Sequence, residues 1–381
     1  MYSENTEELT DPESEKTSQK LSGTNDWTQV TTELQVPPNA SLVYLRLHHS
    51  GVGKAWFDGF KLLVDGKALE QVQIAPALSK KQKKWLKKNT ISISGVNASQ
   101  PGQHPNYKDF YQFGQLVKDA QIIALGESTH GTSEFFRLKH RILEYAVREL
   151  GIRIFAIEDN QLTVERVNSY VLNGVSKDRS MMQGMFSVWQ NEEVFNMIKW
   201  VRAYNLEHPD DKVSFVGFDM QSHYLPLDSL FTFLERQEPT LADSVEIWLE
   251  DLKQNGHNQF MVSIETKLAW FEQAQKSYEA LLAKKMEWLK AAKTTTDSFR
   301  IKWGIQYANL VKQFAENAYK GHLSFYRDEA MAENISWILS MHPPGTKMLV
   351  WAHDNHIARG DHRDNDLNFY FGLSMGRHLS K

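Results

Sequence analysis

From about Tyr107 onward, short apolar runs alternate with longer stretches in which apolar residues recur every three or four positions. The short runs predict strands at Gln121–Leu125, Arg153–Ile157, Val213–Gly217 and Lys347–Trp351. The longer stretches predict helices at Glu134–Leu150, Thr163–Leu172 and Glu192–Leu206. Strands that alternate with helices favour an α/β fold, with a parallel or mixed sheet flanked by helices.

Between Leu225 and Leu339 the pattern is helical almost throughout, and one periodic run extends from Ile264 to about Ala292. No strand pattern interrupts this stretch. It therefore predicts a large helical insertion at about 225–340, over one end of the sheet, within an α/β domain at 105–381.

Near the N-terminus, period-two alternation predicts a small β unit at 26–76. Strands are expected in "QVTTELQV" and "SLVYLRLHH", and "AWFDGFKLLVDGKAL" predicts a hairpin that turns at Asp65-Gly66. The stretch "GVGKAWFDGFKLLVDG" resembles the closing strands of a galactose-binding-like module. The likeness covers only part of such a module, so we do not expect this unit to bind sugar.

Two polar segments flank the β unit. Residues 1–25 are charged and polar, which predicts a disordered tail, and they lack the apolar core of a signal peptide. Residues 77–104 include six lysines between Lys80 and Lys88, which we interpret as a solvated linker. The sequence leaves the compartment open between a cytoplasmic location and, if a leader has been trimmed from this chain, an extracytoplasmic one.

Composition narrows the class of function. The 381 residues carry a net charge of −4, which argues against nucleic acid as a partner. There are no cysteines, which excludes disulfides, a thiol nucleophile and cysteine-ligated zinc. No apolar run approaches the roughly 18 residues of a membrane span. The expected partner is a small molecule, and composition leaves the oligomeric state open.

Each predicted strand ends in residues that could form a site. The carboxyl ends of parallel strands meet at one edge of a sheet, where ligands bind in α/β folds. Four sets of acids and histidines are therefore expected to share one site: Glu127 and His130; Glu158 and Asp159; Asp219, with His223 nearby; and His353, Asp354 and His356.

Three kinds of chemistry are open to this set. Ser128 could act as a nucleophile, but "GESTHG" lacks the G-x-S-x-G pattern of a nucleophile elbow. Imidazoles and carboxylates could hold zinc or manganese, although no H-E-x-x-H motif is present. A histidine could instead act as general base toward water, with a carboxylate to orient it and other histidines to stabilise an oxyanion. This last chemistry needs no cofactor.

Five ordered blocks, "ALGESTHGTSEFFRLKHRILEYAVRELGIRIFAIE", "NEEVFNMIKWVRAYN", "VGFDMQS", "RDEAMAENISWIL" and "VWAHDNHI", resemble the erythromycin esterase family, which also includes proteins labelled as succinoglycan biosynthesis enzymes. The resemblance implies an α/β sandwich with a helical subdomain. Its best-known members hydrolyse the lactone ester of macrolide antibiotics. By motif, His130 would be the base, Glu127 and Glu158 the site acids, and His353 and His356 the second histidine pair.

Two departures from the family pattern stand out. A basic residue of the following helix, often arginine, corresponds to Lys139, which keeps the charge but loses the planar fork. Relatives usually continue through another strand-like segment after the histidine pair, whereas this chain closes with "GLSMGRHLSK".

The resulting hypothesis is a hydrolase that cleaves an ester or lactone without a covalent intermediate. Glu127 or Glu158 would orient His130, while His353, His356 and Lys139 would bind the carbonyl and stabilise the oxyanion. Lys139 and Asp219 complete the predicted binding group, Asp219 by supporting the histidines. The alternatives are a metal-dependent hydrolase and a non-catalytic saccharide- or ligand-binding accessory protein.

Overall fold

The structure is a computed structural model that describes residues 20–36, 59, 61–68, 78–99, 106–175, 179–320, 326–359, 361–364 and 369–380. It divides into two compact units, residues 1–88 and 89–381.

The first unit contains one short hairpin and one helix in its described part. Strands β1 (Leu63–Val64) and β2 (Lys67–Ala68) pair antiparallel. Asp65 and Gly66 form the turn with φ of 50° and 76°, as the Asp-Gly dipeptide predicts. The helix α1 (Lys80–Asn89) occupies part of the segment interpreted as a linker.

Two expectations for this region have other outcomes. The strand expected in "QVTTELQV" is wrong, because residues 29–36 form no strand. The strand expected in "SLVYLRLHH" and the tail before residue 20 lie outside the described residues.

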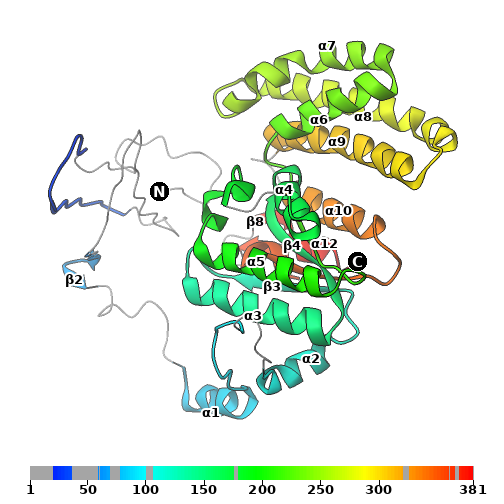
Figure 1. The fold of residues 1–381 in the computed structure, drawn as a ribbon. Helices are drawn as coiled ribbons and strands as arrows, with labels where there is room; N and C mark the ends of the chain where they lie inside the picture. The colour runs from blue at the N-terminus through cyan, green and yellow to red at the C-terminus, as the bar shows by residue number, and fades with distance from the viewer. Residues whose placement is uncertain are drawn as a thin grey trace. The chain divides into compact units, whose positions relative to one another are not determined.

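The second unit is built on a four-stranded parallel sheet, as the sequence predicts (Figure 1). Its strands are β3 (Ile122–Glu127), β4 (Ile152–Asn160), β5 (Ser214–Asp219) and β6 (Lys347–His353), in the order β3-β6-β4-β5. All four coincide with predicted strands and extend a few residues further at their carboxyl ends. The strand that comes last in this sheet along the chain, β6, thus lies between the first two, which brings His353 at its end to the middle of the sheet.

Helices cover both faces of the sheet. On one face, α3 (Ser133–Glu149), α4 (Gln161–Asn173) and α5 (Glu192–Glu207) pack against alternate strand residues such as Phe155 and Trp351. On the other face, α10 (Tyr326–Ser340) packs against their neighbours, such as Ile154 and Val350. Strands buried on both sides explain the continuous apolar runs in the sequence.

Local chemistry sets several helix ends. Asn191 caps α5, and its side chain accepts a hydrogen bond of 2.9 Å from the backbone of Val194. Gly174 ends α4 with φ of 77°, a left-handed conformation that glycine adopts without strain. The predicted bounds of α3, α4 and α5 are accordingly within two residues of the observed ones.

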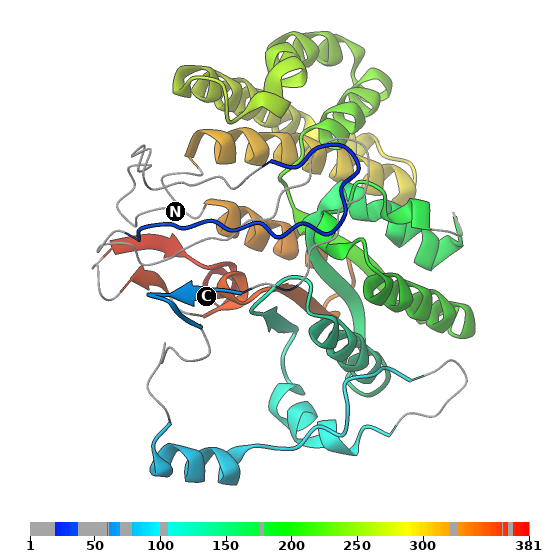
Figure 2. The same cartoon turned by 90° about the vertical axis from the view of Figure 1, so that its left-hand side faces the viewer.

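The helical insertion forms a subdomain with its own core. It consists of α6 (Tyr224–Gln237), α7 (Pro239–Asn255), α8 (Ile264–Ala291) and α9 (Thr295–Lys320). Their inward residues, Leu230, Leu249 and Leu281 among them, are fully buried together. Both views show these four helices grouped at one side of the sheet (Figures 1 and 2). The next helix, α10, is not part of this core and packs on the sheet.

Short elements complete the second unit. The helix α2 (Tyr111–Val117) precedes β3, and α11 (Asp354–Ile357) follows β6 directly. Beyond it, β7 (Asp361–Asp364) and β8 (Phe369–Leu373) pair antiparallel, and α12 (Met375–His378) closes the described chain. Sequence patterning anticipated none of these elements, because each is too short to show a period. Among the described residues, no helix combines the length and apolar character needed to cross a bilayer.

Gly217 in β5 tests how tightly the sheet packs against α4. A Cβ there would lie 2.5 Å from the backbone oxygen of Asp159 and 2.8 Å from a methyl carbon of Val164. We expect Gly217→Ala to lower the free energy of unfolding by about 1–3 kcal/mol, the usual cost of overpacking. The control is Gly95→Ala, where a Cβ has no neighbour within 4 Å. Equal urea midpoints for the two variants would contradict this packing.

Candidate active site

The carboxyl edge of the sheet gathers the predicted site residues. Glu127 at the end of β3 lies in register with His353 at the end of β6. Asn160 at the end of β4 lies in register with Asp219 at the end of β5. The parallel arrangement therefore brings side chains from four distant segments to one edge, as predicted.

His130 is held by Glu127. The Nδ1 atom of His130 lies 2.7 Å from Oε1 of Glu127, whose carboxylate is buried and also accepts a 3.0 Å hydrogen bond from the indole of Trp351. The His130 side chain remains 38% exposed. The hydrogen bond to Glu127 raises the pKa of His130 above its ordinary value, although burial opposes the shift. Because Nδ1 donates to the carboxylate, Nε2 of the neutral ring is left with a lone pair.

His353 lies next to His130 and is held in the opposite tautomer. The two ring centroids lie 5.4 Å apart. Nδ1 of His353 accepts a 3.2 Å hydrogen bond from the backbone of Asn355, because His353 caps α11. The proton of the neutral ring therefore sits on Nε2. One histidine thus offers an acceptor and its neighbour a donor.

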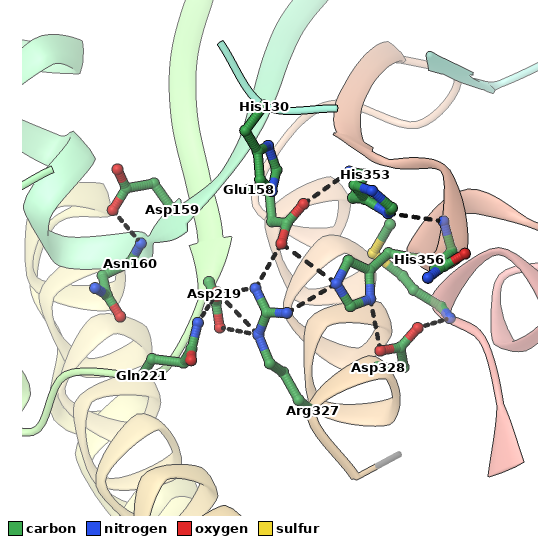
Figure 3. A network of polar contacts seen from close by, with 12 residues as sticks. His130, Glu158, Asp159, Asn160, Asp219, Gln221, Arg327, Asp328, His353 and His356 are labelled. Carbon is green, nitrogen blue, oxygen red and sulfur yellow. Dashed lines mark hydrogen bonds and ion pairs between the residues drawn. The ribbon is translucent and has the colours of Figure 1, made fainter. Parts of the chain in front are cut away.

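His356 is held at both ring nitrogens. Nδ1 lies 2.7 Å from Oδ1 of Asp328, and Nε2 lies 2.8 Å from Nη1 of Arg327 (Figure 3). Arginine can only donate, so Nε2 accepts and Nδ1 donates. Asp328 is anchored in turn by a 2.8 Å hydrogen bond from the backbone of Met375. Both nitrogens are occupied, so His356 supports the site instead of stabilising an oxyanion as the sequence predicted.

Arg327 ties the acids of two strands together. Its guanidinium donates 2.6 Å hydrogen bonds to Glu158 of β4 and to Asp219 of β5 (Figure 3). Burial opposes its charge, but these two carboxylates together raise its pKa above the ordinary value. The other oxygen of Glu158 accepts a 2.8 Å hydrogen bond from the backbone of His353. Glu158 therefore fixes the end of β6, and it is Glu127 that holds His130.

Asp219 lies at the end of β5, where it holds Arg327. The residue is fully buried, and its carboxylate is occupied by Arg327, by Gln221 at 2.9 Å and by the backbone of Met220 at 2.7 Å. Burial would raise the pKa of Asp219, but Arg327 lowers it below its ordinary value. Asp219 supports His356 through Arg327.

Lys139 is the basic residue predicted to bind the substrate. Its ammonium donates to the backbone oxygen of Gly126 and lies 5.8 Å from the ring centroid of Trp351. The residue is only 7% exposed, and burial lowers its pKa. The ammonium of Lys139 is therefore engaged by the backbone at the end of β3, and its role in substrate binding stays a prediction.

Two further strand-end residues point away from the histidines. Asp159 accepts hydrogen bonds from the backbone of Asn160 and Phe186 and so holds the segment before α5, while burial raises its pKa to about 7. His223 packs against Tyr224 and Phe314 at the start of α6, where burial lowers its pKa to about 4. Neither residue belongs to the group around His130.

Arg327 and Asp328 were missed in the sequence, although they stand in the block "RDEAMAENISWIL". They begin α10, so they follow no strand and fall outside a search of strand ends. The only sign of their role in the sequence was the cluster of charged residues, Arg327, Asp328 and Glu329, at the start of a helix with many apolar residues.

The described residues contain no group of three or more histidine, aspartate or glutamate side chains with the geometry of a metal site. His356 lies 3.4 Å from Glu158, but Arg327 contacts both of them, so a cation already occupies that position.

Glu127→Gln tests how the carboxylate tunes His130. The variant removes the main cause of the raised pKa of His130, so this pKa should fall toward or below its ordinary value. If unprotonated His130 is the base, the acidic limb of the kcat profile should move to lower pH, with a lower plateau because the imidazolium loses its counter-charge. A profile recorded between pH 5 and 9 checks this result. An unmoved limb would show that another group titrates there.

The same His130–Glu127 pair has a consequence for folding. A raised folded-state pKa contributes stability that is fully present below about pH 6.5, the pKa of an unperturbed histidine. This contribution is lost as the pH rises through the folded-state value. Glu127→Gln should therefore destabilise the protein more at pH 5.5 than at pH 8.5.

The protein has an α/β fold with a parallel sheet and a helical subdomain. Histidines paired with carboxylates lie at the carboxyl edge of the sheet, where α/β enzymes bind their ligands. The chain belongs to the erythromycin esterase family, whose family model matches residues 147–381. The matched range contains Glu158, Arg327, His353 and His356. It begins after His130, so the place of Glu127 and His130 rests on their geometry.

Individual relatives are distant. The Bacillus subtilis protein YbfO is 22% identical over 301 residues, which cover 72% of this chain and 63% of that protein. An Escherichia coli protein named erythromycin esterase type II is 30% identical over 128 residues, which cover 32% of this chain and 30% of its own length. The chain thus spans less than two thirds of either relative.

Solved structures share the fold. A Bacillus cereus protein superimposes with a TM-score of 0.66 at 24% identity, over 80% of this chain and 72% of that one. A mutant of the erythromycin esterase EreC in its open conformation gives a TM-score of 0.59 at 17% identity, over 74% and 72%. A succinoglycan biosynthesis protein gives 0.64 at 21%, over 80% and 73%. At these identities the likeness establishes the fold.

Proposed function

We propose that the protein hydrolyses a carboxylic ester or lactone by direct attack of water, with His130 as the general base. The observation that carries the proposal is the pairing of two histidines in complementary forms. His130 is fixed by Glu127 with its lone pair on Nε2, and its ring lies 5.4 Å from that of His353, whose proton is on Nε2. A base and a hydrogen-bond donor thus stand side by side.

In the first step, Nε2 of His130 takes a proton from water as the oxygen of that water attacks the carbonyl carbon. Glu127 stabilises the imidazolium that forms, because its buried carboxylate lies 2.7 Å from Nδ1. The carbonyl oxygen becomes an oxyanion, and the Nε2 proton of His353 is the donor available to stabilise it.

In the second step, the tetrahedral intermediate collapses and the bond to the alkoxy oxygen breaks. The departing oxygen takes the proton from His130, which returns to its neutral form. The products are a carboxylic acid and an alcohol, or a single hydroxy acid from a lactone. No bond to the protein forms at any stage.

Arg327 and His356 act as positioning residues in this scheme. They connect the start of α10 to the carboxyl ends of β4 and β5, and Glu158 connects that network to the backbone of His353. The network fixes where the donor lies relative to the base, which matters because small displacements of reacting groups lower rates strongly.

We base the proposed substrate class on the names of the relatives. Relatives named as erythromycin esterases make a macrolide-type lactone the first candidate, and other bulky esters the next. A hydrolysis screen across macrolactones, small lactones and aryl esters, with and without EDTA, tests the proposal. We expect turnover of at least one class that persists after chelation. Absence of turnover throughout would favour a ligand-binding accessory protein.

A metal-dependent hydrolase is the second candidate, because Glu127, His130 and His353 supply suitable ligand types. The hydrogen bonds already made by Glu127 and His353 favour the metal-free scheme. Activity that is lost with EDTA and restored by zinc or manganese would establish the metal-dependent reaction instead.

A further inference from the structure

The helix α1 carries an unusual distribution of charge that the proposed hydrolase does not use. Its ten residues, "KKQKKWLKKN", include six lysines and no acid, and none of the ten is buried. The whole chain has a net charge of −4, so this positive charge is a local feature.

The six lysines are confined to one side of α1. At 3.6 residues per turn, they fall within an arc of about 160°. Gln82, Trp85, Leu86 and Asn89 fall within the opposite arc of about 100°. Trp85 is 64% exposed and Leu86 is 38% exposed. The helix therefore has a cationic side and an opposite side on which Trp85 and Leu86 flank two uncharged amide residues.

Local hydrogen bonds start this helix at a defined residue. The hydroxyl of Ser79 accepts a 3.2 Å hydrogen bond from the backbone of Gln82, and the side chain of Gln82 accepts a 2.8 Å hydrogen bond from the backbone of Ser79. This reciprocal pair is a capping box. At the other end, Lys87 and Lys88 lie where positive charge favours a helix.

We propose that α1 is an interfacial helix that binds the protein to anionic lipid surfaces. An anionic bilayer matches both sides of the helix at once: the interface takes up Trp85 and Leu86, while headgroups neutralise the lysines. A polyanion in solution, such as DNA, would match the lysine side alone.

The orientation makes a distinction among the lysines. With Trp85 and Leu86 directed at the membrane, Lys81, Lys83 and Lys88 lie at the flanks of α1, where they reach headgroups. Lys80, Lys84 and Lys87 lie on the side away from the membrane. If the helix bound a polyanion through its cationic side, this second set would instead make the closest contacts.

Two triple variants of the full chain separate these cases. The flank variant is Lys81→Gln, Lys83→Gln and Lys88→Gln, and the outer variant is Lys80→Gln, Lys84→Gln and Lys87→Gln. Both remove three charges, and glutamine has nearly the helix propensity of lysine. Binding is measured by co-sedimentation with phosphatidylcholine vesicles, with and without 30 mol% phosphatidylserine, at about 0.1 M salt.

We expect binding to the phosphatidylserine vesicles only. A lysine at the surface contributes a factor of about 5 in affinity, so the flank variant should lose about 100-fold and the outer variant distinctly less. Trp85→Ala should lose about 10-fold. The matched control Phe260→Ala, whose ring is 88% exposed in the helical subdomain, should not change binding.

Three outcomes would overturn the proposal. One is no preference for phosphatidylserine vesicles. Another is an equal loss for the two triple variants together with no effect of Trp85→Ala. The third is tighter binding to duplex DNA at the same salt concentration than to the vesicles.

Discussion

Arg327→Met is expected to lower the free energy of unfolding by about 3–5 kcal/mol, the usual result of removing one partner from a buried ion pair. The variant leaves Asp219, which is fully buried, and Glu158, which is 5% exposed, without their shared cation. It also removes the donor to Nε2 of His356. Stability is measured by urea denaturation at pH 7.

The matched control is Arg300→Met. Arg300 pairs with Asp297 at 2.9 Å, but its side chain is 52% exposed. Exposed pairs contribute about 0–1 kcal/mol, so this variant should remain close to the parent protein. A similar small loss for Arg327→Met would contradict the place given to Arg327 in the network.

The pH dependence of Arg327→Met provides a second check. Arg327 lowers the pKa of Asp219 below its ordinary value, so the stability from this pair is present above about pH 4 and is lost as the pH falls through the folded-state pKa. In the variant Asp219 can fold protonated. The difference in stability between variant and parent should therefore be large at pH 7 and small near pH 3.

The sheet could be predicted because its strands are buried on both faces and so read as continuous apolar runs. The residues after those runs could be predicted to meet because parallel strands share a carboxyl edge. The register of the strands then shows which residues lie side by side, and the sequence alone does not show this. Glu127 lies in register with His353 because β6, the last strand of this sheet in chain order, inserts beside β3.

Arg327 shows where that inference stops. It begins a helix, 108 residues from Asp219 in the chain, and nothing local indicates which strand ends it reaches. For the same reason the sequence could not show which groups contact His356. Its free nitrogens could be counted only once Arg327 and Asp328 were placed on either side of it.

Lys139 is a case in which the sequence held the answer. It lies three residues after Phe136 and four before Leu143, both of which are buried on the inner side of α3. That spacing places Lys139 on the same side of the helix. The predicted binding role followed from the family motif. The helical spacing of the buried apolar residues was the better guide to where Lys139 lies on α3.

His130 is the proposed base, and removing its imidazole has the largest expected effect on activity. General-base catalysis contributes about 10²–10⁴-fold, so His130→Ala should lower kcat by that factor. The side chain is 38% exposed and contacts Glu127 at the edge of the sheet, so the core should be undisturbed. The control is His257→Ala, an exposed histidine of the helical subdomain, which should keep full activity.

The decisive measurement is kcat and melting temperature of His130→Ala on one preparation, with the best substrate from the hydrolysis screen. A general-base role for His130 predicts a fall in kcat of at least about 100-fold, with a melting temperature within a few degrees of the parent protein. A near-normal kcat per folded molecule, together with a clear loss of thermal stability, would contradict it. His130 would then be part of the architecture of the strand end, and the base would have to be sought elsewhere.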